Sequence, residues 1–356
     1  MTEQNKKAAA ALESMFEHYK IPCQVVDIIS NNFSTRYQLE PCQGVKVNKI
    51  KSLLPDLSIY FDNPQIIINE GLYLKVETKN AQRVFYDFFK YADKDTSKRI
   101  PLYLGVDEKN QKVCLDLSKL PHLLVSGSTG SGKSVFLHDL ILSLLSENNQ
   151  ILMIDPKRVE MSIYKGVKGV NVLTDTADIL RGLQSAVDLM YYRYNIMENQ
   201  GIVDGHGHFD PYIIIIDELS DLMLNKEIKK QVETSICRIA QMGRAAAVHV
   251  IIATQRPSVN VLTGLIKANI PARVVFSCAS AVDSRCIINQ KGAERLKGLG
   301  DGYIMLSDTD NLTRFQAYSN NTTDILNYIK PIMTPTRTQR PTQRPKKLGL
   351  FARLLA

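Results

Sequence analysis

The chain has 356 residues, 44% of them hydrophobic and 22% charged, which is typical of a soluble globular protein with two compact domains or one large and one small domain. No stretch approaches the roughly 20 apolar residues of a membrane-spanning helix, so we do not expect a membrane protein. The six cysteines form no CxxC pair, so we expect free thiols in a cytoplasmic protein rather than a disulfide framework or a zinc site. The net charge of +8 does not by itself indicate nucleic-acid binding, because six basic residues and no acid follow Pro331 and account for most of that charge.

The first 95 residues mix helical and strand-like patterns. The N-terminal run MTEQNKKAAAALESMFEHYK predicts a helix and not a signal peptide, because acids flank its alanines and no long apolar core follows. Four runs then combine β-branched residues with turn signals: QVVDII, STRYQLE, VKVNKI and IIINEGLYLKVE. We therefore expect a small α+β domain over residues 1–95, and we interpret the polar stretch YADKDTSK (91–98) as a linker.

Residues 96–320 show a different pattern, in which short apolar runs alternate with helical stretches. The runs are HLLVSG, ILMID, YIIIID, VHVIIAT, RVVFSC and YIML. Near-continuous Val, Ile and Leu is typical of strands in a parallel sheet whose two faces are both covered by helices, so this region predicts an α/β domain. Residues 321–356 predict a short helix, TTDILNYI, followed by a basic, proline-rich tail without stable structure.

The strongest motif is a glycine-rich loop between a predicted strand and a predicted helix. The run GSTGSGKS fits G-x-x-x-x-G-K-[ST], which binds nucleotide phosphates through inward-facing backbone N–H groups and the positive end of the following helix. We expect Lys133 to reach the β- and γ-phosphates and Ser134 to bind Mg²⁺. The correct strand and helix on its two sides disfavour a chance match. The predicted ATP-binding residues are Gly127, Ser128, Thr129, Gly130, Ser131, Gly132, Lys133, Ser134 and Val135.

A second strand ends in two adjacent acids. Four isoleucines lead to Asp217 and Glu218. We expect Asp217 to hold Mg²⁺ directly or through water, and Glu218 to polarise the attacking water. Solvated acids often end a core strand, but a phosphate loop in the same domain needs such a partner. The turn from Asp155 to Lys157 follows another predicted strand beside the nucleotide site, and it is assigned no role.

Two further residues complete the predicted catalytic set. Gln255 follows the strand VHVIIAT, where a sensor of the γ-phosphate would lie, and Arg244 precedes that strand. An arginine from a neighbouring subunit stabilises transition-state charge in many phosphoryl-transfer enzymes, and Arg244 is a candidate for this role. A surface salt bridge is the alternative for Arg244. Arg256 follows Gln255 at the start of a loop, and for this residue an ordinary turn at the end of the strand is the alternative to a functional role.

These motifs stand within longer runs that resemble one family. The runs HLLVSGSTGSGKSV, DPKRVEMSIY, IIIIDELSDLM, ATQRPSVNVLTGLIKANIPARVVF and DSRCIINQKGAERLKGLGDGYI are similar to the motor of the FtsK/SpoIIIE DNA translocases. TRYQLEPCQGVKVNKIKSLLPDLS resembles the small domain that precedes this motor, so the resemblance runs from about Tyr19 to Tyr318. It implies a RecA-like P-loop ATPase that uses ATP and Mg²⁺ and assembles as a hexameric ring around double-stranded DNA.

The resemblance also implies roles for particular residues. Arg244 matches the position of an arginine finger that acts on a neighbouring subunit. Arg256, Lys267 and Arg285 fall in loops that face the pore and contact DNA in such motors, and basic residues there suit a motor that holds phosphates without reading bases. A solvated surface is the alternative for Lys267 and Arg285. Ala281 is neutral where relatives are often basic.

The chain departs from the family in what surrounds the motor. We expect no membrane anchor before the motor, and the short run after Tyr318 does not predict the winged-helix domain that reads DNA sequence in many members of the family. We therefore expect an ATPase that moves double-stranded DNA for a plasmid or mobile element, with a recruiting protein partner and no direct membrane insertion. The alternatives are a conjugative coupling ATPase that pumps single-stranded DNA, a protein-export ATPase of related fold, and a non-hydrolysing DNA-binding scaffold, which the presence of Lys133, Asp217 and Glu218 disfavours.

Overall fold

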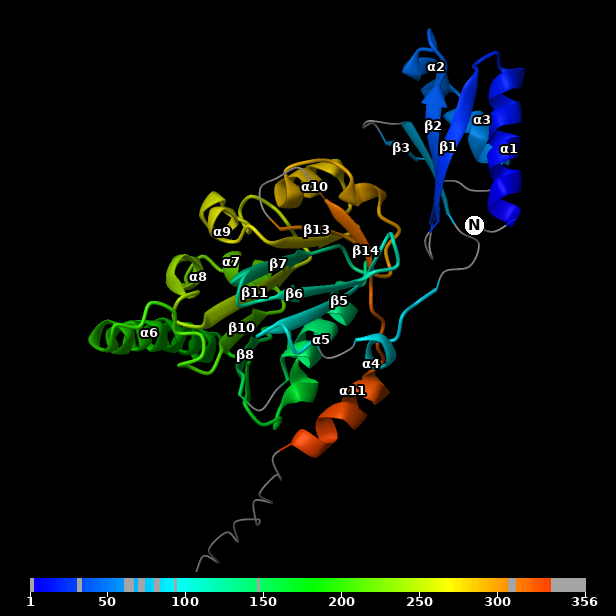
Figure 1. Cartoon of the computed structure of the whole chain (residues 1–356). Coiled ribbons are helices and arrows are strands. Elements are labelled where there is room, and N and C mark those ends of the chain that lie inside the picture. The colour runs from blue at the N-terminus through cyan, green and yellow to red at the C-terminus, as the bar shows by residue number, and fades with distance from the viewer. Residues whose placement is uncertain are drawn as a thin grey trace, which may run out of the picture.

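The computed structural model describes residues 3–30, 34–60, 67–69, 74–79, 84–92, 95–145, 148–306 and 312–333. Within these ranges the chain forms two sheets, one of four strands in the N-terminal part and one of ten strands in the rest (Figure 1). No helix in the same ranges is long and apolar enough to cross a membrane.

The smaller sheet is antiparallel, and one long helix packs on it. Its elements are α1 (Glu3–His18), β1 (Cys23–Ser30), β2 (Ser34–Pro41), α2 (Val47–Ser52), α3 (Leu54–Tyr60), β3 (Ile67–Asn69) and β4 (Leu74–Lys79). The strand order is β1-β2-β4-β3. Leu12 and Phe16, four residues apart on α1, are buried in one core with Tyr37, Leu39 and Val76, as expected of one apolar face of a helix.

The prediction of a strand at VKVNKI is wrong, because residues 47–52 form helix α2. Ile50 and Leu53, which caps the C-terminus of α2 three residues later, are buried on one face of this helix. Leu57 of the next helix, α3, belongs to the same core. Val47 is exposed. Burial of the helical face therefore outweighs the local alternation of Val and Lys that suggested a strand.

The larger sheet contains the glycine-rich loop. Its strands and helices are α4 (Phe88–Tyr91), β5 (Pro101–Asp107), β6 (Lys112–Asp116), β7 (His122–Ser126), α5 (Lys133–Leu144), β8 (Gln150–Ile154), β9 (Val170–Leu173), α6 (Thr176–Gln200), β10 (Tyr212–Ile216), α7 (Leu219–Met223), α8 (Lys229–Met242), β11 (Val248–Thr254), α9 (Gly264–Asn269), β12 (Arg273–Phe276), α10 (Ala281–Ile288), β13 (Asp301–Met305), β14 (Thr313–Ala317) and α11 (Thr322–Ile329). The strand order is β6-β5-β14-β13-β12-β7-β11-β10-β8-β9. The strands from β12 to β9 are parallel, and the remaining pairings are antiparallel.

Helices cover both faces of the parallel strands, which explains their unbroken apolar runs. Leu123 and Val125 of β7 belong to the core that contains α5. Leu124, between them, belongs to the core that contains α6 and α8. Successive side chains thus enter opposite cores, and both cores require apolar residues. The predicted α/β fold is confirmed, with strand β7 and its loop placed between β12 and β11.

Segments from before and after the larger sheet pack on one of its faces. Phe88 of α4 and Ile325 of α11 belong to the core that contains α5, and the Phe88 N–H donates to the Ser319 carbonyl over 2.8 Å. Helix α11 spans the run TTDILNYI. The domain limits at residues 95 and 320 stay predictions, and the predicted basic tail (334–356) lies outside the described residues.

Candidate functional site

The glycine-rich loop forms the turn between β7 and α5. Gly130 and Gly132 have φ angles of 78° and 103°, which residues with a side chain rarely adopt. A Cβ on Gly132 would also lie 2.4 Å from the Gly300 nitrogen. Helix α5 begins at Lys133, so the positive end of its dipole lies at the loop. The loop therefore has the backbone form that phosphate binding requires.

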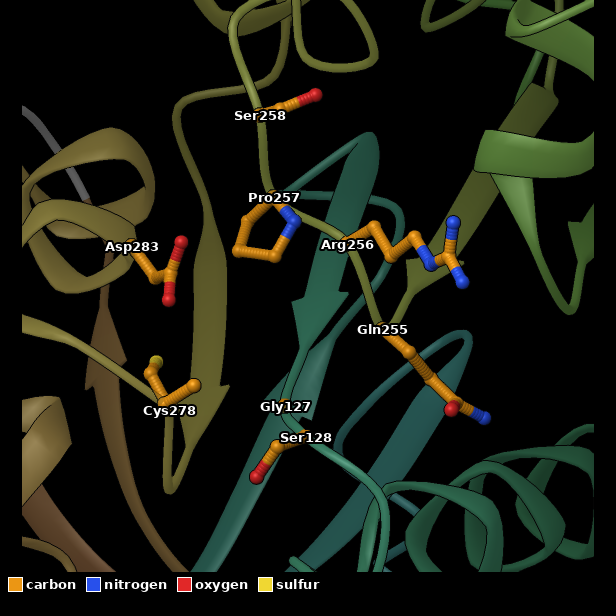
Figure 2. A pocket seen from close by; sticks show the side chains of 9 residues that line it. Gly127, Ser128, Gln255, Arg256, Pro257, Ser258, Cys278 and Asp283 are labelled. Atoms are coloured by element: carbon orange, nitrogen blue, oxygen red, sulfur yellow. The ribbon is translucent and has the colours of Figure 1, made fainter.

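The start of this loop borders a cleft of about 270 Å³ (Figure 2). Gly127 and Ser128 line it together with residues 255–258, which follow β11, and residues near the start of α10, including Asp283. In Figure 2 the side chains of Gln255 and Arg256 point away from Asp283. The segment that carries Gln255 and Arg256 thus lies directly beside the phosphate loop.

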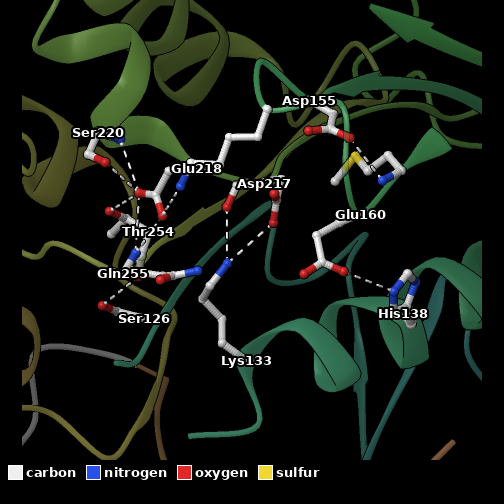
Figure 3. Close-up of polar contacts among 12 residues, drawn as sticks. Ser126, Lys133, His138, Asp155, Glu160, Asp217, Glu218, Ser220, Thr254 and Gln255 are labelled. Carbon is white, nitrogen blue, oxygen red and sulfur yellow. Dashed lines mark hydrogen bonds and ion pairs between the residues drawn. The ribbon is translucent and has the colours of Figure 1, made fainter. Parts of the chain in front are cut away.

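The structure brings Lys133 to the end of β10 (Figure 3). Its Nζ donates to the Asp217 carbonyl over 3.1 Å and to Asp217 Oδ1 over 3.3 Å, and both residues are buried. Strands β7 and β10 both pair with β11 in parallel, so the three carboxyl ends meet at one edge of the sheet. Two motifs that are 84 residues apart therefore form one site.

Three carboxylates, those of Asp217, Glu160 and Asp155, interact electrostatically at this site, and Asp217 contacts the Lys133 ammonium. Burial is the main cause that raises the pKa of Asp217, Lys133 opposes this effect, and Glu160 and Asp155 add to it. Asp155 is fully buried, and within the described residues its Oδ1 has no hydrogen-bond partner. An excess of carboxylate oxygens over cations is an environment that suits Mg²⁺, so these residues fit the predicted ion.

Glu218 is held by hydrogen bonds from its own turn and from the end of β11. Its Oε1 accepts from Ser220 Oγ over 2.8 Å and from Thr254 Oγ1 over 2.7 Å, and its Oε2 accepts from the Gln255 N–H over 3.0 Å. The Lys157 Nζ lies 3.8 Å from Oε2. A buried carboxylate fixed at so many points keeps one orientation, which suits a group that orients a water for attack.

The predicted sensor Gln255 contacts the phosphate loop as well as Glu218. Its side-chain Oε1 accepts from Thr129 Oγ1 over 2.9 Å, while its backbone N–H donates to Glu218. The end of β11 therefore connects the two halves of the site. A second connection runs through Thr254, whose carbonyl accepts from the Gly127 N–H over 3.4 Å and whose Oγ1 donates to Glu218.

Sequence reasoning missed the residues that hold these groups in place. Thr254 and Ser220 orient Glu218, and His138 Nε2 lies 3.5 Å from Glu160 Oε2. A hydrogen bond from His138 is the main cause that lowers the pKa of Glu160, and one from Ser134 contributes. Only Thr254 carried a signal, since a polar residue at the end of an apolar strand marks the edge of a parallel sheet.

Arg244 lies far from the nucleotide site of its own chain. It is exposed in the turn between α8 and β11. Strand β11 lies between this turn and Gln255, and at the usual rise of a strand its length is about 20 Å. A role in nucleotide hydrolysis would therefore require the site of another subunit.

The three predicted DNA-contact residues lie on different segments. Arg256 is exposed after β11, and Arg285 is exposed on α10. Lys267 is half-buried on α9, and its Nζ donates to the Cys286 carbonyl over 3.2 Å, so α9 and α10 lie side by side (Figure 1). Within the described ranges, no hydrogen bond or ion pair joins Arg256 to Lys267 or Arg285.

The similarity of this chain to known sequences covers most of its length. The sequence model of the FtsK/SpoIIIE family matches residues 89–213 and 206–259, and that of the FtsK alpha domain matches residues 1–75. The DNA translocase FtsK of Caldanaerobacter subterraneus subsp. tengcongensis is 39% identical over 317 residues, which are 82% of this chain and 44% of the relative. The DNA translocase FtsK of Haemophilus influenzae is 35% identical over 364 residues, which are 89% of this chain and 68% of the relative.

Solved structures share the fold. The pCW3 conjugation coupling protein TcpA, in its monomer form with ATPγS, has a TM-score of 0.68 at 23% identity over 91% of this chain and 99% of that chain. The cytoplasmic domain of the Thermomonospora curvata type VII secretion ATPase EccC has a TM-score of 0.56 at 22% identity over 68% of this chain and 32% of that chain. The chain spans about half the length of several curated relatives that it matches. Because both family models match consecutive parts of the chain and its relatives exceed 30% identity over most of it, the chain belongs to the FtsK/SpoIIIE family.

Proposed function

We propose that this chain is an ATPase that moves double-stranded DNA and works as a hexameric ring. The observation that supports this best is the contact of Lys133 with Asp217 beside a Glu218 that Thr254 and Gln255 hold in place. A scaffold that only binds DNA has no need for a buried, oriented carboxylate at a phosphate loop. Relatives named DNA translocase FtsK share 32% to 39% identity with it over most of its length.

In this proposal the loop from Gly127 to Val135 binds the phosphates of ATP. The backbone N–H groups and the start of α5 supply partial positive charge, and Lys133 exchanges its bond to Asp217 for the β- and γ-phosphates. Ser134 and Asp217 are the residues that would hold Mg²⁺. When bound, the ion neutralises charge that develops on the phosphates.

Hydrolysis then requires an oriented water and compensation of charge. Glu218 accepts a hydrogen bond from the attacking water, and its fixed orientation sets the direction of attack. Gln255, already bonded to Thr129, detects the γ-phosphate. Because Arg244 lies at the opposite end of β11, it serves the site of the neighbouring subunit, where it stabilises transition-state charge.

Movement of DNA requires contacts that do not depend on base sequence. Arg256, Lys267 and Arg285 supply these contacts from the segments after β11, on α9 and on α10. Each binds backbone phosphates, so affinity falls as salt rises. Arg256 adjoins Gln255, which gives the nucleotide site a short covalent route to a DNA contact.

Steady-state ATP hydrolysis tests this function. The rate is measured without DNA, with linear duplex DNA and with single-stranded DNA, and Lys133→Ala serves as the blank. We expect duplex DNA to stimulate hydrolysis and the variant to show neither basal nor stimulated activity. Glu218→Gln, which keeps the shape of the side chain, should still bind ATPγS but not hydrolyse ATP. Equal rates with and without DNA would contradict a DNA motor.

The same experiment separates the alternatives. Preference for single-stranded DNA would favour a conjugative coupling ATPase, a reading consistent with the full-length likeness to TcpA. Indifference to both forms of DNA would favour a protein substrate, as for the secretion ATPases of the same fold.

We further propose that the chain acts for a plasmid or mobile element and is recruited by a partner protein. Deletion should then impair transfer or maintenance of the element, and a defect in chromosome partitioning alone would contradict it.

A further inference from the structure

A buried cluster of charges joins the small sheet to the large one. Glu77 of β4 is 1% exposed, and its Oε1 accepts from Arg314 Nη1 of β14 over 2.5 Å. Arg36 Nε lies 3.3 Å from Oε2, and Lys297 Nζ lies 3.5 Å from Oε1. Burial alone would raise the pKa of Glu77, but the three cations hold it at about 2. A charged carboxylate therefore fixes the contact between the two sheets.

Arg314 transmits this contact to the start of β13. Its Nε donates to Asp301 Oδ1 over 2.9 Å, and its Nη2 donates to Asp301 Oδ2 over 2.8 Å, with both residues buried. Such a paired geometry leaves little freedom to either side chain. Asp301 also accepts from the Lys297 N–H over 2.8 Å. One carboxylate thus holds both ends of the loop formed by residues 298–300.

This loop has an unusual backbone. Gly298, Leu299 and Gly300 have φ angles of 70°, 49° and 87°, so three successive residues are left-handed, and one of them is not glycine. Leucine in this conformation is strained and persists only where its surroundings impose it. Gln316 Nε2 of β14 donates to the Leu299 carbonyl over 2.9 Å, and the Asp301 N–H donates to the Gly298 carbonyl over 3.1 Å.

The other side of the loop supports the phosphate-binding turn. The Gly300 N–H donates to the Ser131 carbonyl over 2.8 Å, and the Leu299 N–H lies 3.4 Å from the Gly130 carbonyl. Gly132 packs so closely on Gly300 that no side chain fits between them. The two carbonyls of the phosphate loop point outward to residues 298–300. Both carbonyls are thereby bound from outside the turn, while the Ser131 N–H donates to the Ser128 carbonyl within it over 3.1 Å. The loop is thus held in the shape that directs backbone N–H groups toward a phosphate.

We propose that Glu77 is a positioning residue for ATP binding. Through Arg314 and Asp301 it holds residues 298–300 in the left-handed form that supports the phosphate loop. Docking of the small sheet and binding of nucleotide therefore favour each other, by the same factor in both directions. This inference rests on the ATP binding proposed above, and it adds a route by which the N-terminal part of the chain controls it.

The contrary case is a structural anchor without a functional link. Glu77 would then fix the small sheet in place, and nucleotide affinity would not depend on it. Glu108 provides the matched comparison, because its carboxylate forms an ion pair with Arg36 of β2 and no described contact joins it to Arg314. Glu108→Gln thus perturbs the same junction without touching the path to the phosphate loop.

The test is the affinity of the full chain for ATPγS with Mg²⁺, measured by calorimetry. We expect Glu77→Gln to raise the Kd at least about 5-fold, the lower end of usual coupling between sites, and Glu108→Gln to change it less than about twofold. Asp301→Asn should resemble Glu77→Gln, and the double variant should be no worse than the single ones, because both act through Arg314. A wild-type Kd in a folded Glu77→Gln variant would overturn the proposal.

A second measurement needs no change at Glu77, in case that variant does not fold. Amide hydrogen exchange of β4 is followed in the unmodified chain with and without ATPγS and Mg²⁺. We expect nucleotide to slow exchange in β4, and Lys133→Ala to abolish the effect. Tight binding of ATPγS with unchanged exchange would overturn the coupling alone. Failure of the unmodified chain to bind ATPγS would overturn the proposed function as well.

Discussion

At the scale of single residues, Thr254 shows how one hydroxyl orients the proposed catalytic carboxylate. Its Oγ1 donates to Glu218 and accepts from the Arg256 N–H over 3.1 Å. We expect Thr254→Val, which keeps the shape of the side chain, to lower kcat for ATP about 10-fold and to change the Kd for ATPγS less than about twofold. Glu218 would lose a fixed bond while the phosphate loop stays intact.

Steady-state hydrolysis and a separate binding titration distinguish these two effects. Thr254→Ser keeps the hydroxyl and is the control, with kcat close to that of the unmodified chain. A Thr254→Val variant with full kcat would show that the other bonds to Glu218 suffice. Equal losses in kcat and affinity would instead indicate damage to the phosphate loop.

Two buried histidines near the start of strands β7 and β11 make stability depend on pH. Burial lowers the pKa of His122 to about 3 and that of His249 to about 4. In the unfolded chain both take up protons below pH about 6.5, whereas the folded chain holds them neutral. The free energy of unfolding therefore falls as pH decreases from 6.5 toward 4, by up to about 1.4 kcal/mol per pH unit for each histidine.

Urea unfolding at pH 7.5 and pH 5 measures this loss. In His249→Leu the loss between the two pH values should be smaller by about 2 kcal/mol, because one of the two proton uptakes is removed. Any cost from losing the bond between His249 Nδ1 and the Pro121 carbonyl affects both pH values and cancels in the difference. An unchanged loss would show that other groups cause the acid sensitivity.

At the scale of elements, Arg273 joins the two helices that carry proposed DNA contacts. It is 3% exposed, and its guanidinium donates to the Lys267 carbonyl of α9 over 2.9 Å and to the Ile287 carbonyl of α10 over 2.8 Å. A cation at the last carbonyls of a helix also stabilises its dipole. The relative position of α9 and α10 thus depends on one buried side chain.

We expect Arg273→Met to reduce stimulation of the ATPase by duplex DNA about 10-fold while the rate without DNA is kept, because the contacts of α9 and α10 lose their common support. Lys267→Ala is the comparison, since it removes one phosphate contact and should reduce the salt slope of duplex binding by about 1. ATPase assays and anisotropy titrations at several salt concentrations separate the two variants. Full stimulation in Arg273→Met would contradict this role.

At the scale of the whole molecule, patterns local in sequence predicted most of the fold and the main parts of the site. The apolar runs around Leu123 and Ile214 lie in strands, as predicted, because burial on two faces leaves a strong local signal. The helix at Val47 was missed, since its pattern depends on which face becomes buried. The contact of Glu77 with Arg314 joins residues 237 apart, and no local pattern indicates such a pair.

The ring proposed here predicts that Arg244 of one subunit completes the site of the next. Arg244→Ala keeps its own phosphate loop, whereas Lys133→Ala keeps its arginine. Each variant alone should have little ATPase activity. In a mixture, an Arg244→Ala subunit beside a Lys133→Ala subunit regains an arginine, so equal amounts in random rings should reach about a quarter of the wild-type rate. A mixture no more active than its separate components would show that Arg244 does not act between subunits, and restored activity would require subunits in contact around a shared site.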